Sequence, residues 1–280
     1  MKEIIIVKAS GEKEPFSEEK LRKSLERAGA SEAVANVVVK KISEEITEGT
    51  TTSKIYDRVF RILREEERAV AGRYNLKRAL FELGPTGHPF EKLIGELLKE
   101  RGYKVGVGKI VKGVCVSHEI DVVAEKGRKH ILVECKYHNQ PGAKSDIKVA
   151  LYVQSRFEDI KKRFEKDPEH SEKFHSIWIA TNTKFTTDAI NYATCVNMFA
   201  LGWNQPRDNS LQRMMETSNF YPLTSLTSLS RNQKQTLLNY GLVLCRDVLA
   251  NKQFLPSMGF KETKIVEIER EIEGLYKATK

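Results

Sequence analysis

Three side chains of one short stretch could do phosphate chemistry together: Asp121, Glu134 and Lys136. The stretch is typical of a β-hairpin, with a short apolar run after Asp121, a polar turn that contains a glycine, and alternating residues over His130–His138. Side chains on a strand alternate between its two faces, so Glu134 and Lys136 point the same way, about 7 Å apart. Asp121 heads the first strand and can lie beside them across the hairpin.

This combination of residue types indicates metal-assisted hydrolysis. Two carboxylates that are packed together raise each other's pKa unless a cation lies between them. Their oxygens suit Mg²⁺ or Mn²⁺, which keep several waters and also accept a phosphate oxygen. Such a metal polarises the phosphate and lowers the pKa of a bound water, while the lysine orients that water or offsets transition-state charge. The alternative is an edge hairpin with a solvated charged face and no chemistry.

Alternating helices and strands surround the hairpin. A helix is expected over residues 88–100, where apolar residues recur on one face, and a strand follows over residues 103–110. After the hairpin we expect a helix beyond residue 145, and then a strand, a helix and a strand over residues 175–181, 185–193 and 197–203. This order predicts an α/β sheet domain.

The landmarks of this region resemble the Mrr-like branch of the restriction-endonuclease fold, with its PD-(D/E)xK core. They are Phe90-Glu91 ahead of Gly102-Tyr103, the hairpin itself, Thr181-Asn182 at a strand end, and the segment Phe185-Thr-Thr-Asp-Ala189. The resemblance implies a DNA endonuclease that uses Mg²⁺ or Mn²⁺. It also implies that Asp121 and Glu134 ligate the metal, that Lys136 is catalytic, and that Glu91 supports the site as a helix carboxylate.

Three further residues are candidates for substrate contact. Gln154 lies on the helix after the hairpin, where some members of the family carry a glutamine, although it also fits a partly exposed helix position. His118 and His138 flank the hairpin site. Histidine can act as a general base, but nucleases of this fold normally need none, so we expect both at the rim of the site.

The first eighty residues indicate a small, mainly helical domain. A short β-branched strand precedes a turn at Gly11, and Ser17 is a plausible N-cap for the next helix. Three more helices are expected over residues 33–45, from Thr52 onward, and over residues 67–83, where Gly84-Pro85 ends the last one.

The run from Val7 to Leu21 resembles the opening of the ATP-cone domain, a nucleotide-sensing module. The resemblance implies that ATP or dATP is bound by five residues, namely Lys8, Glu14, Ser17, Lys20 and Thr52. The lysines would donate charge-assisted hydrogen bonds to phosphates, and Thr52 lies at a helix start, where anions are favoured. Ala9 stands where the family usually has arginine. The alternative is a helical domain that keeps the fold and binds no nucleotide.

From about residue 216 the pattern becomes helical again. Gly241 and Gly259 lie in turns between helices, which resembles a helix-hairpin-helix module whose backbone amides could face phosphate. A packing or oligomerisation domain fits nearly as well. We therefore expect a multi-domain α/β protein with an ATP-cone at residues 1–84, a restriction-endonuclease-like sheet core at 85–215, and a small helical domain at 216–280.

The amino-acid composition limits the classes of binding partner that we expect for the chain. The net charge is +9, from 47 basic and 38 acidic residues, which favours a polyanion such as DNA. No apolar run approaches the ~20 residues that span a bilayer, and the N-terminus does not resemble a signal peptide. The four cysteines show no CxxC spacing. We expect a cytoplasmic protein that binds no membrane, and a homo-oligomer is compatible with these features.

These features predict a metal-dependent DNA endonuclease whose activity in restriction or repair is regulated by ATP or dATP. The alternative is a nucleotide-responsive DNA-binding regulator with an inactive nuclease fold. The intact set of Asp121, Glu134 and Lys136 argues against that alternative, since an inactive site has no reason to retain all three.

Overall fold

The structure is a computed structural model that describes residues 4–8 and 10–277. Contacts group the chain into two units: the stretches Met1–Ala79 and Tyr221–Lys280 form the first, and Leu80–Phe220 forms the second. The three-way division expected at residues 84 and 215 stays a prediction. That the two ends of the chain fold into one unit was not predicted.

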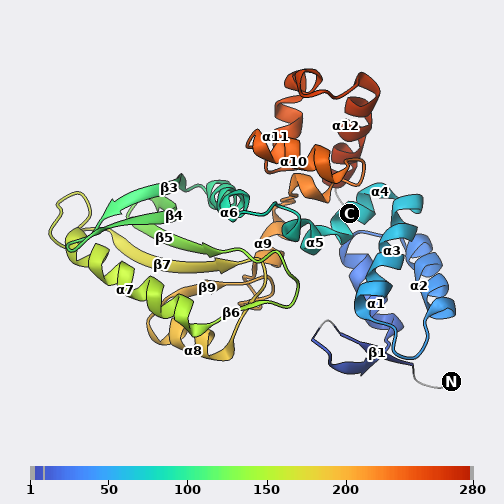
Figure 1. Cartoon of the computed structure of the whole chain (residues 1–280), viewed down its shortest axis with the longest axis horizontal. Coiled ribbons are helices and arrows are strands. Elements are labelled where there is room, and N and C mark those ends of the chain that lie inside the picture. Colours follow the sequence, from blue (N-terminus) through green and yellow to red (C-terminus); the bar gives the residue numbers. More distant parts are fainter. Residues whose placement is uncertain (1–3, 9, 278–280) are drawn as a thin grey trace. The chain divides into compact units, whose positions relative to one another are not determined.

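The second unit is built on a five-stranded mixed sheet (Figure 1). Its strands follow the order β3-β4-β5-β7-β9, in which β3, β4 and β5 are antiparallel and β5, β7 and β9 are parallel. Their bounds are β3 (Lys104–Lys112), β4 (Ser117–Lys126), β5 (Lys129–Lys136), β7 (Phe174–Thr181) and β9 (Phe199–Leu201). The predicted hairpin is thus β4–β5, and it lies inside the sheet rather than at its edge.

Helices cover both faces of this sheet, with α6 (His88–Glu100) on one side and α7 (Ile147–Phe164) and α8 (Thr187–Cys195) on the other (Figure 1). α6 lies close to the strands, because a Cβ at Gly95 would be only 3.1 Å from the Val107 side chain. On the opposite face Phe157 and Ile160 of α7 pack with strand residues such as Leu132. Because both faces of the sheet are buried, the pairing register of the strands is fixed. A slip by one residue would move every side chain of a strand to the opposite face.

Shorter elements complete the unit: β6 (Lys144–Ser145), β8 (Lys184–Phe185) and α9 (Leu211–Thr217). β6 and β8 pair in parallel, which the sequence did not predict. The helix expected from residue 185 begins at Thr187, because Thr186 is its N-cap and accepts a hydrogen bond from the N–H of Ala189.

The first unit combines a small hairpin with helices from both ends of the chain. Its N-terminal elements are β1 (Ile5–Val7), β2 (Lys13–Pro15), α1 (Glu18–Arg27), α2 (Glu32–Glu45), α3 (Thr52–Glu66) and α4 (Arg68–Tyr74), after which α5 (Leu76–Phe81) leads into the second unit. Its C-terminal helices are α10 (Arg231–Asn239), α11 (Cys245–Ala250) and α12 (Glu262–Tyr276), with single 3₁₀ turns η1 (Leu223–Ser225), η2 (Lys252–Phe254) and η3 (Pro256–Met258).

Local predictions in this unit were partly wrong. The single helix expected over residues 67–83 is divided into α4 and α5 at Asn75, whose side chain accepts a 2.6 Å hydrogen bond from Tyr56. The turn at Gly11 is followed by a second strand, β2, which was not expected. Ser17 caps α1 as predicted, and α3 begins at Thr52 as expected, with Thr51 as its cap.

The two ends of the chain meet where α4 packs on α12. A Cβ at Gly72 would be 2.8 Å from Leu275 Cδ2, and one at Gly274 would be 3.0 Å from the Cβ of Ala69. Glycines therefore let the two helices approach closely. Within the described ranges 4–8 and 10–277, no helix is long and apolar enough to cross a membrane.

Candidate active site

The candidate active site lies where β4 and β5 separate. Their paired register ends at Val122 and Val133, so Asp121 has no backbone partner across the hairpin. Its carboxylate instead accepts a 2.7 Å hydrogen bond from the N–H of Cys135. Asp121 is therefore held against Cys135, the residue between Glu134 and Lys136. The structure brings together the three residues on which the sequence interpretation depended.

Glu134 is the centre of an ion-pair triad with Lys136 and Arg156. Lys136 Nζ lies 2.7 Å from one carboxylate oxygen, and Arg156 Nη1 lies 2.6 Å from the other. Glu134 and Lys136 share one face of β5, in keeping with strand alternation. The Glu134 side chain is only 9% exposed, and both of its oxygens face a cation.

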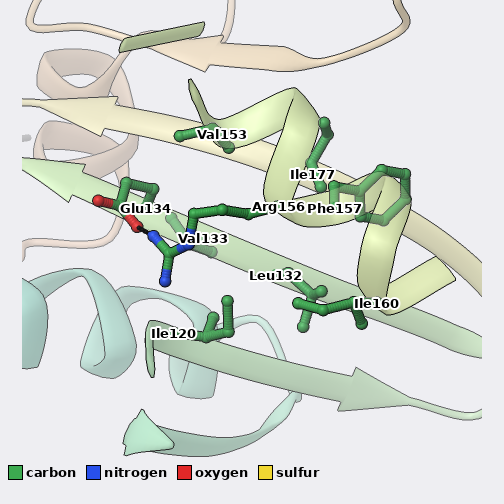
Figure 2. A pocket seen from close by; sticks show the side chains of 9 residues that line it. All are labelled: Ile120, Leu132, Val133, Glu134, Val153, Arg156, Phe157, Ile160 and Ile177. Atoms are coloured by element: carbon green, nitrogen blue, oxygen red, sulfur yellow. Dashed lines mark hydrogen bonds and ion pairs between the residues drawn. The ribbon is translucent and has the colours of Figure 1, made fainter. Parts of the chain in front are cut away.

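Sequence reasoning missed Arg156. It reaches from α7 to Glu134 across a small pocket (Figure 2). Its guanidinium also donates to the backbone oxygen of Glu119 in β4. The rest of that pocket is apolar and is formed by residues of β4, β5, β7 and α7, namely Ile120, Leu132, Val133, Val153, Phe157, Ile160 and Ile177. The available signal was an arginine between Val153 and Phe157, on the buried side of an amphipathic helix.

Asp121 differs from Glu134 in its electrostatics. Burial, and then the charge of Glu134 together with that of Glu91, raises the pKa of Asp121 from 3.8 to about 6. Glu91 lies in the first turn of α6, where His88 Nδ1 is 3.1 Å from its carboxylate. Tyr137 holds this end of α6 beside β5, because its ring packs on Phe90. The site therefore carries negative charge that a cation would relieve.

The donor set fits a hard divalent cation, although the present arrangement is closed. Among residues 4–8 and 10–277, no three His, Cys, Asp or Glu side chains are gathered closely enough to hold a metal ion. Asp121 and Glu134 supply the carboxylate oxygens that Mg²⁺ and Mn²⁺ prefer. Lys136 and Arg156 each pair with one oxygen of Glu134, so a metal at Glu134 would compete with these two cations for the carboxylate.

The weaker candidates differ in position. His138 follows Lys136 by two residues and joins the end of β5 to β6, because its Nε2 is 3.0 Å from Ser145 Oγ. Burial lowers its pKa. His118 pairs with Asp159 of α7 at 2.8 Å, and the Gln154 amide donates to Glu158 at 2.7 Å. His118 and Gln154 are thus engaged with carboxylates of α7 rather than with those of the hairpin.

The predicted nucleotide contacts are connected to one another in the first unit. Glu14 Oε2 lies 3.0 Å from Lys8 Nζ and 3.2 Å from Lys20 Nζ, and these two lysines lower the pKa of Glu14. Ser17 Oγ accepts from the N–H of Lys20. Val7 and Thr51 form a parallel bridge, which brings Lys8 beside Thr52. Ala9 lies outside the described residues.

Three known families match successive parts of the chain. Residues 4–80 match the ATP cone domain, residues 84–201 match a restriction endonuclease family, and residues 221–276 match the family described as AF1548-like, C-terminal. An uncharacterised protein of Archaeoglobus fulgidus is 36% identical over 176 residues, which are 62% of this chain and 95% of that protein. The crystal structure of AF1548, a protein of unknown function, shares 34% identity and a TM-score of 0.55, over 67% of this chain and 97% of that one.

The chain belongs to the AF1548-like family. The predicted fold class is confirmed: an ATP-cone precedes a restriction-endonuclease domain and a helical C-terminal region. The MspJI restriction endonuclease, solved in complex with a 27-mer oligonucleotide, is a more distant likeness. Its TM-score is 0.30 at 12% identity, over 54% of this chain and 31% of that one. For the AF1548-like C-terminal region, helix-hairpin-helix DNA binding stays a prediction.

Proposed function

We propose that this protein is a metal-dependent endodeoxyribonuclease of the cytoplasm whose activity is regulated by ATP or dATP bound to its cone, in DNA restriction or repair. The observation that carries the proposal is the meeting of Asp121, Glu134 and Lys136 where β4 and β5 separate. The restriction-endonuclease and ATP-cone families support a nuclease with nucleotide regulation. The basic net charge of +9 favours a DNA substrate.

Asp121 and Glu134 would hold Mg²⁺ or Mn²⁺, with Glu91 as a supporting carboxylate. When bound, the metal supplies Lewis-acid polarisation of the phosphate and a water of lowered pKa. Lys136 would then orient the attacking water or stabilise the charge that develops on the phosphate. Arg156 holds Glu134 in place and donates to Glu119 O, so it is a positioning residue in this scheme.

In the first unit, Lys8, Ser17, Lys20 and Thr52 would contact the nucleotide together with Glu14. The phosphates would compete with Glu14 for both lysines, which lie at 3.0 and 3.2 Å from its carboxylate. His138 is the best placed of the proposed substrate contacts, because it lies two residues from Lys136. His118 and Gln154 would reach substrate only after leaving their partners on α7.

The closed ion-pair triad favours one alternative, a nucleotide-responsive DNA-binding regulator that does not cut DNA. Both oxygens of Glu134 are already neutralised by Lys136 and Arg156. In a nuclease the metal would share Glu134 with these cations or replace one of them. In a regulator the triad would remain closed.

A cleavage assay on linear, supercoiled and branched DNA separates the two functions. It uses Mg²⁺ or Mn²⁺, with and without ATP or dATP. We expect Lys136→Ala to lower the cleavage rate by about a hundredfold or more, the usual effect of losing a group that stabilises transition-state charge. Lys129→Ala is the matched control, since Lys129 lies exposed at the other end of β5. Glu134→Ala tests the carboxylate.

DNA binding that shifts with nucleotide, without cleavage of any substrate, would establish the regulator instead. Cleavage that Lys136→Ala leaves unchanged would show that the activity comes from elsewhere. Thermal melting of each variant is needed beside the assay, because Glu134→Ala leaves Arg156 and Lys136 without their shared partner.

A further inference from the structure

The end of the β3–β4 hairpin displays three apolar side chains to solvent. Ile110, Val114 and Val116 are 67, 53 and 60% exposed, and we refer to them as the apolar tip. Single exposed apolar residues are ordinary on a protein surface. Three of them within seven residues, at the end of an edge strand, form a group that normally contacts a partner.

The turn that carries the apolar tip is held in one conformation by Asp159 of α7. Its carboxylate accepts from the N–H of Cys115 at 2.8 Å and from that of Val116 at 3.3 Å, and its backbone oxygen accepts from Val114 at 3.2 Å. Glycine is required at position 113, where a Cβ would be 2.0 Å from Asp159 Oδ2. Exposure of the tip is therefore built into the structure and does not come from a loose loop.

The apolar tip is connected directly to the candidate active site. Asp159 and Arg156 are three residues apart on α7 and so lie on the same side of that helix. Arg156 holds Glu134 and donates to Glu119 O, while Asp159 holds His118 of the same strand. The start of β4 is thus fixed twice to α7, between the tip and Asp121.

Basic residues surround the tip. Lys109 and Lys112 are exposed on β3: Lys112 shares a face with Ile110, and Lys109 lies on the other face with its side chain against Gly106. Lys162 of α7 is close enough for its charge to act on Cys115 in the turn. The nearby acidic residues are Asp159, which is paired with His118, and the exposed Glu119 opposite Ile110. An apolar group within a basic rim is complementary to the sugars and phosphates of a nucleic-acid backbone.

We propose that the apolar tip enters a groove of duplex DNA beside the bond to be cut, while Lys109 and Lys112 bind the flanking phosphates. This rests on the proposed DNA substrate and names a surface that binds it. Val114 and Val116 would pack on sugars and base edges, and the preformed turn keeps the entropy cost of binding low. A second copy of the chain is a poorer partner, because Lys109 and Lys112 of one copy would repel the same lysines of the other.

Binding of labelled duplexes to the full chain, measured by fluorescence anisotropy in EDTA, tests the tip without any cleavage. For the double variant Val114→Ser with Val116→Ser we expect affinity to fall about tenfold, a loss of about 1.4 kcal/mol, with an unchanged salt dependence. For Lys109→Ala with Lys112→Ala we expect the slope of log affinity against log salt to fall by about 2, since each phosphate contact contributes about 0.9.

Val37→Ser is the matched control, because Val37 is an exposed valine on α2 of the other unit. Tip variants that melt like the wild type and bind every duplex equally well would overturn the proposal, as would a wild type that binds no duplex. A tip variant that changes only the oligomeric state in light scattering would assign the surface to self-association. The proposed nuclease function fails separately, if Lys136→Ala leaves cleavage unchanged.

Discussion

At the scale of single residues, the two carboxylates of the hairpin have different partners. Glu134 is neutralised by Lys136 and Arg156, whereas Asp121 accepts one backbone hydrogen bond and faces the charges of Glu134 and Glu91. A carboxyl group whose pKa is raised to about 6 costs folding stability at neutral pH. Functional sites commonly carry such a cost.

Asp121→Asn should stabilise the protein at about pH 8 by about 1 kcal/mol, a value discounted from the full shift because the group is partly exposed to solvent. The asparagine oxygen can still accept the N–H of Cys135. Because the folded-state pKa is raised above 3.8, the stability cost of Asp121 develops as pH rises from about 4 to about 6. The advantage of the variant should therefore disappear as pH falls to about 4, as measured by thermal melting.

Asp208→Asn is the control for this experiment, since Asp208 is exposed in a loop of the same unit. Mg²⁺ or Mn²⁺ should raise the melting temperature of the wild type at about pH 8, because an ion that binds only the folded state stabilises it. Asp121→Asn should remove most of that increase. If Asp121→Asn melts below the wild type at every pH, the raised pKa is not the dominant effect.

At the scale of elements, α4 and α12 depend on glycines for their close contact. Gly72→Val should destabilise the first unit by about 2 kcal/mol, since overpacking typically costs 1–3 kcal/mol. A side chain there meets both Leu275 and the backbone oxygen of Ser225, which cannot easily move. Denaturant unfolding followed by circular dichroism measures the change.

Lys40→Val controls for this substitution, because it places the same β-branched residue at an exposed position of a helix in the same unit. Its cost should be a few tenths of a kcal/mol, from helix propensity alone. Equal costs for the two variants would show that α4 and α12 do not pack as closely as the structure has them.

At the scale of the whole molecule, the ATP-cone domain and the C-terminal helices form one unit. Arg73 of α4 donates to the backbone oxygens of Ala28, at the end of α1, and of Gly274, near the end of α12. α1 begins next to Ser17 and carries Lys20, two of the proposed nucleotide contacts. A ligand that orders α1 therefore has a direct path to α12.

Binding of ATP or dATP should slow amide hydrogen exchange in α1, because the proposed nucleotide contacts order that helix. It should also slow exchange in the last turn of α12, which Arg73 links to α1. Arg73→Gln should keep protection in α1 and lose most of it in α12. Arg64→Gln, an exposed arginine of α3, should leave both unchanged. Protection confined to α1 in the wild type would contradict the coupling.

The sequence by itself determined the local elements and the spacing of the hairpin residues. α6 has the predicted bounds, and Glu134 and Lys136 share a face, because helix and strand periodicities are local properties of the chain. The expectation that Asp121 heads its strand was wrong, because β4 begins at Ser117 and Asp121 lies in its middle. Short elements such as β2 and β6 were missed, since two or three residues carry too little periodic signal to predict a strand.

Only the tertiary structure decided which distant groups meet. Arg156 reaches Glu134 from another element, Asp159 fixes a turn more than forty residues away in sequence, and Arg73 joins the two ends of the chain. The tertiary structure also pairs His118 and Gln154 with carboxylates of α7. Such contacts depend on how helices pack across a sheet and on which buried charges need partners. Neither is encoded in the periodicity of one segment.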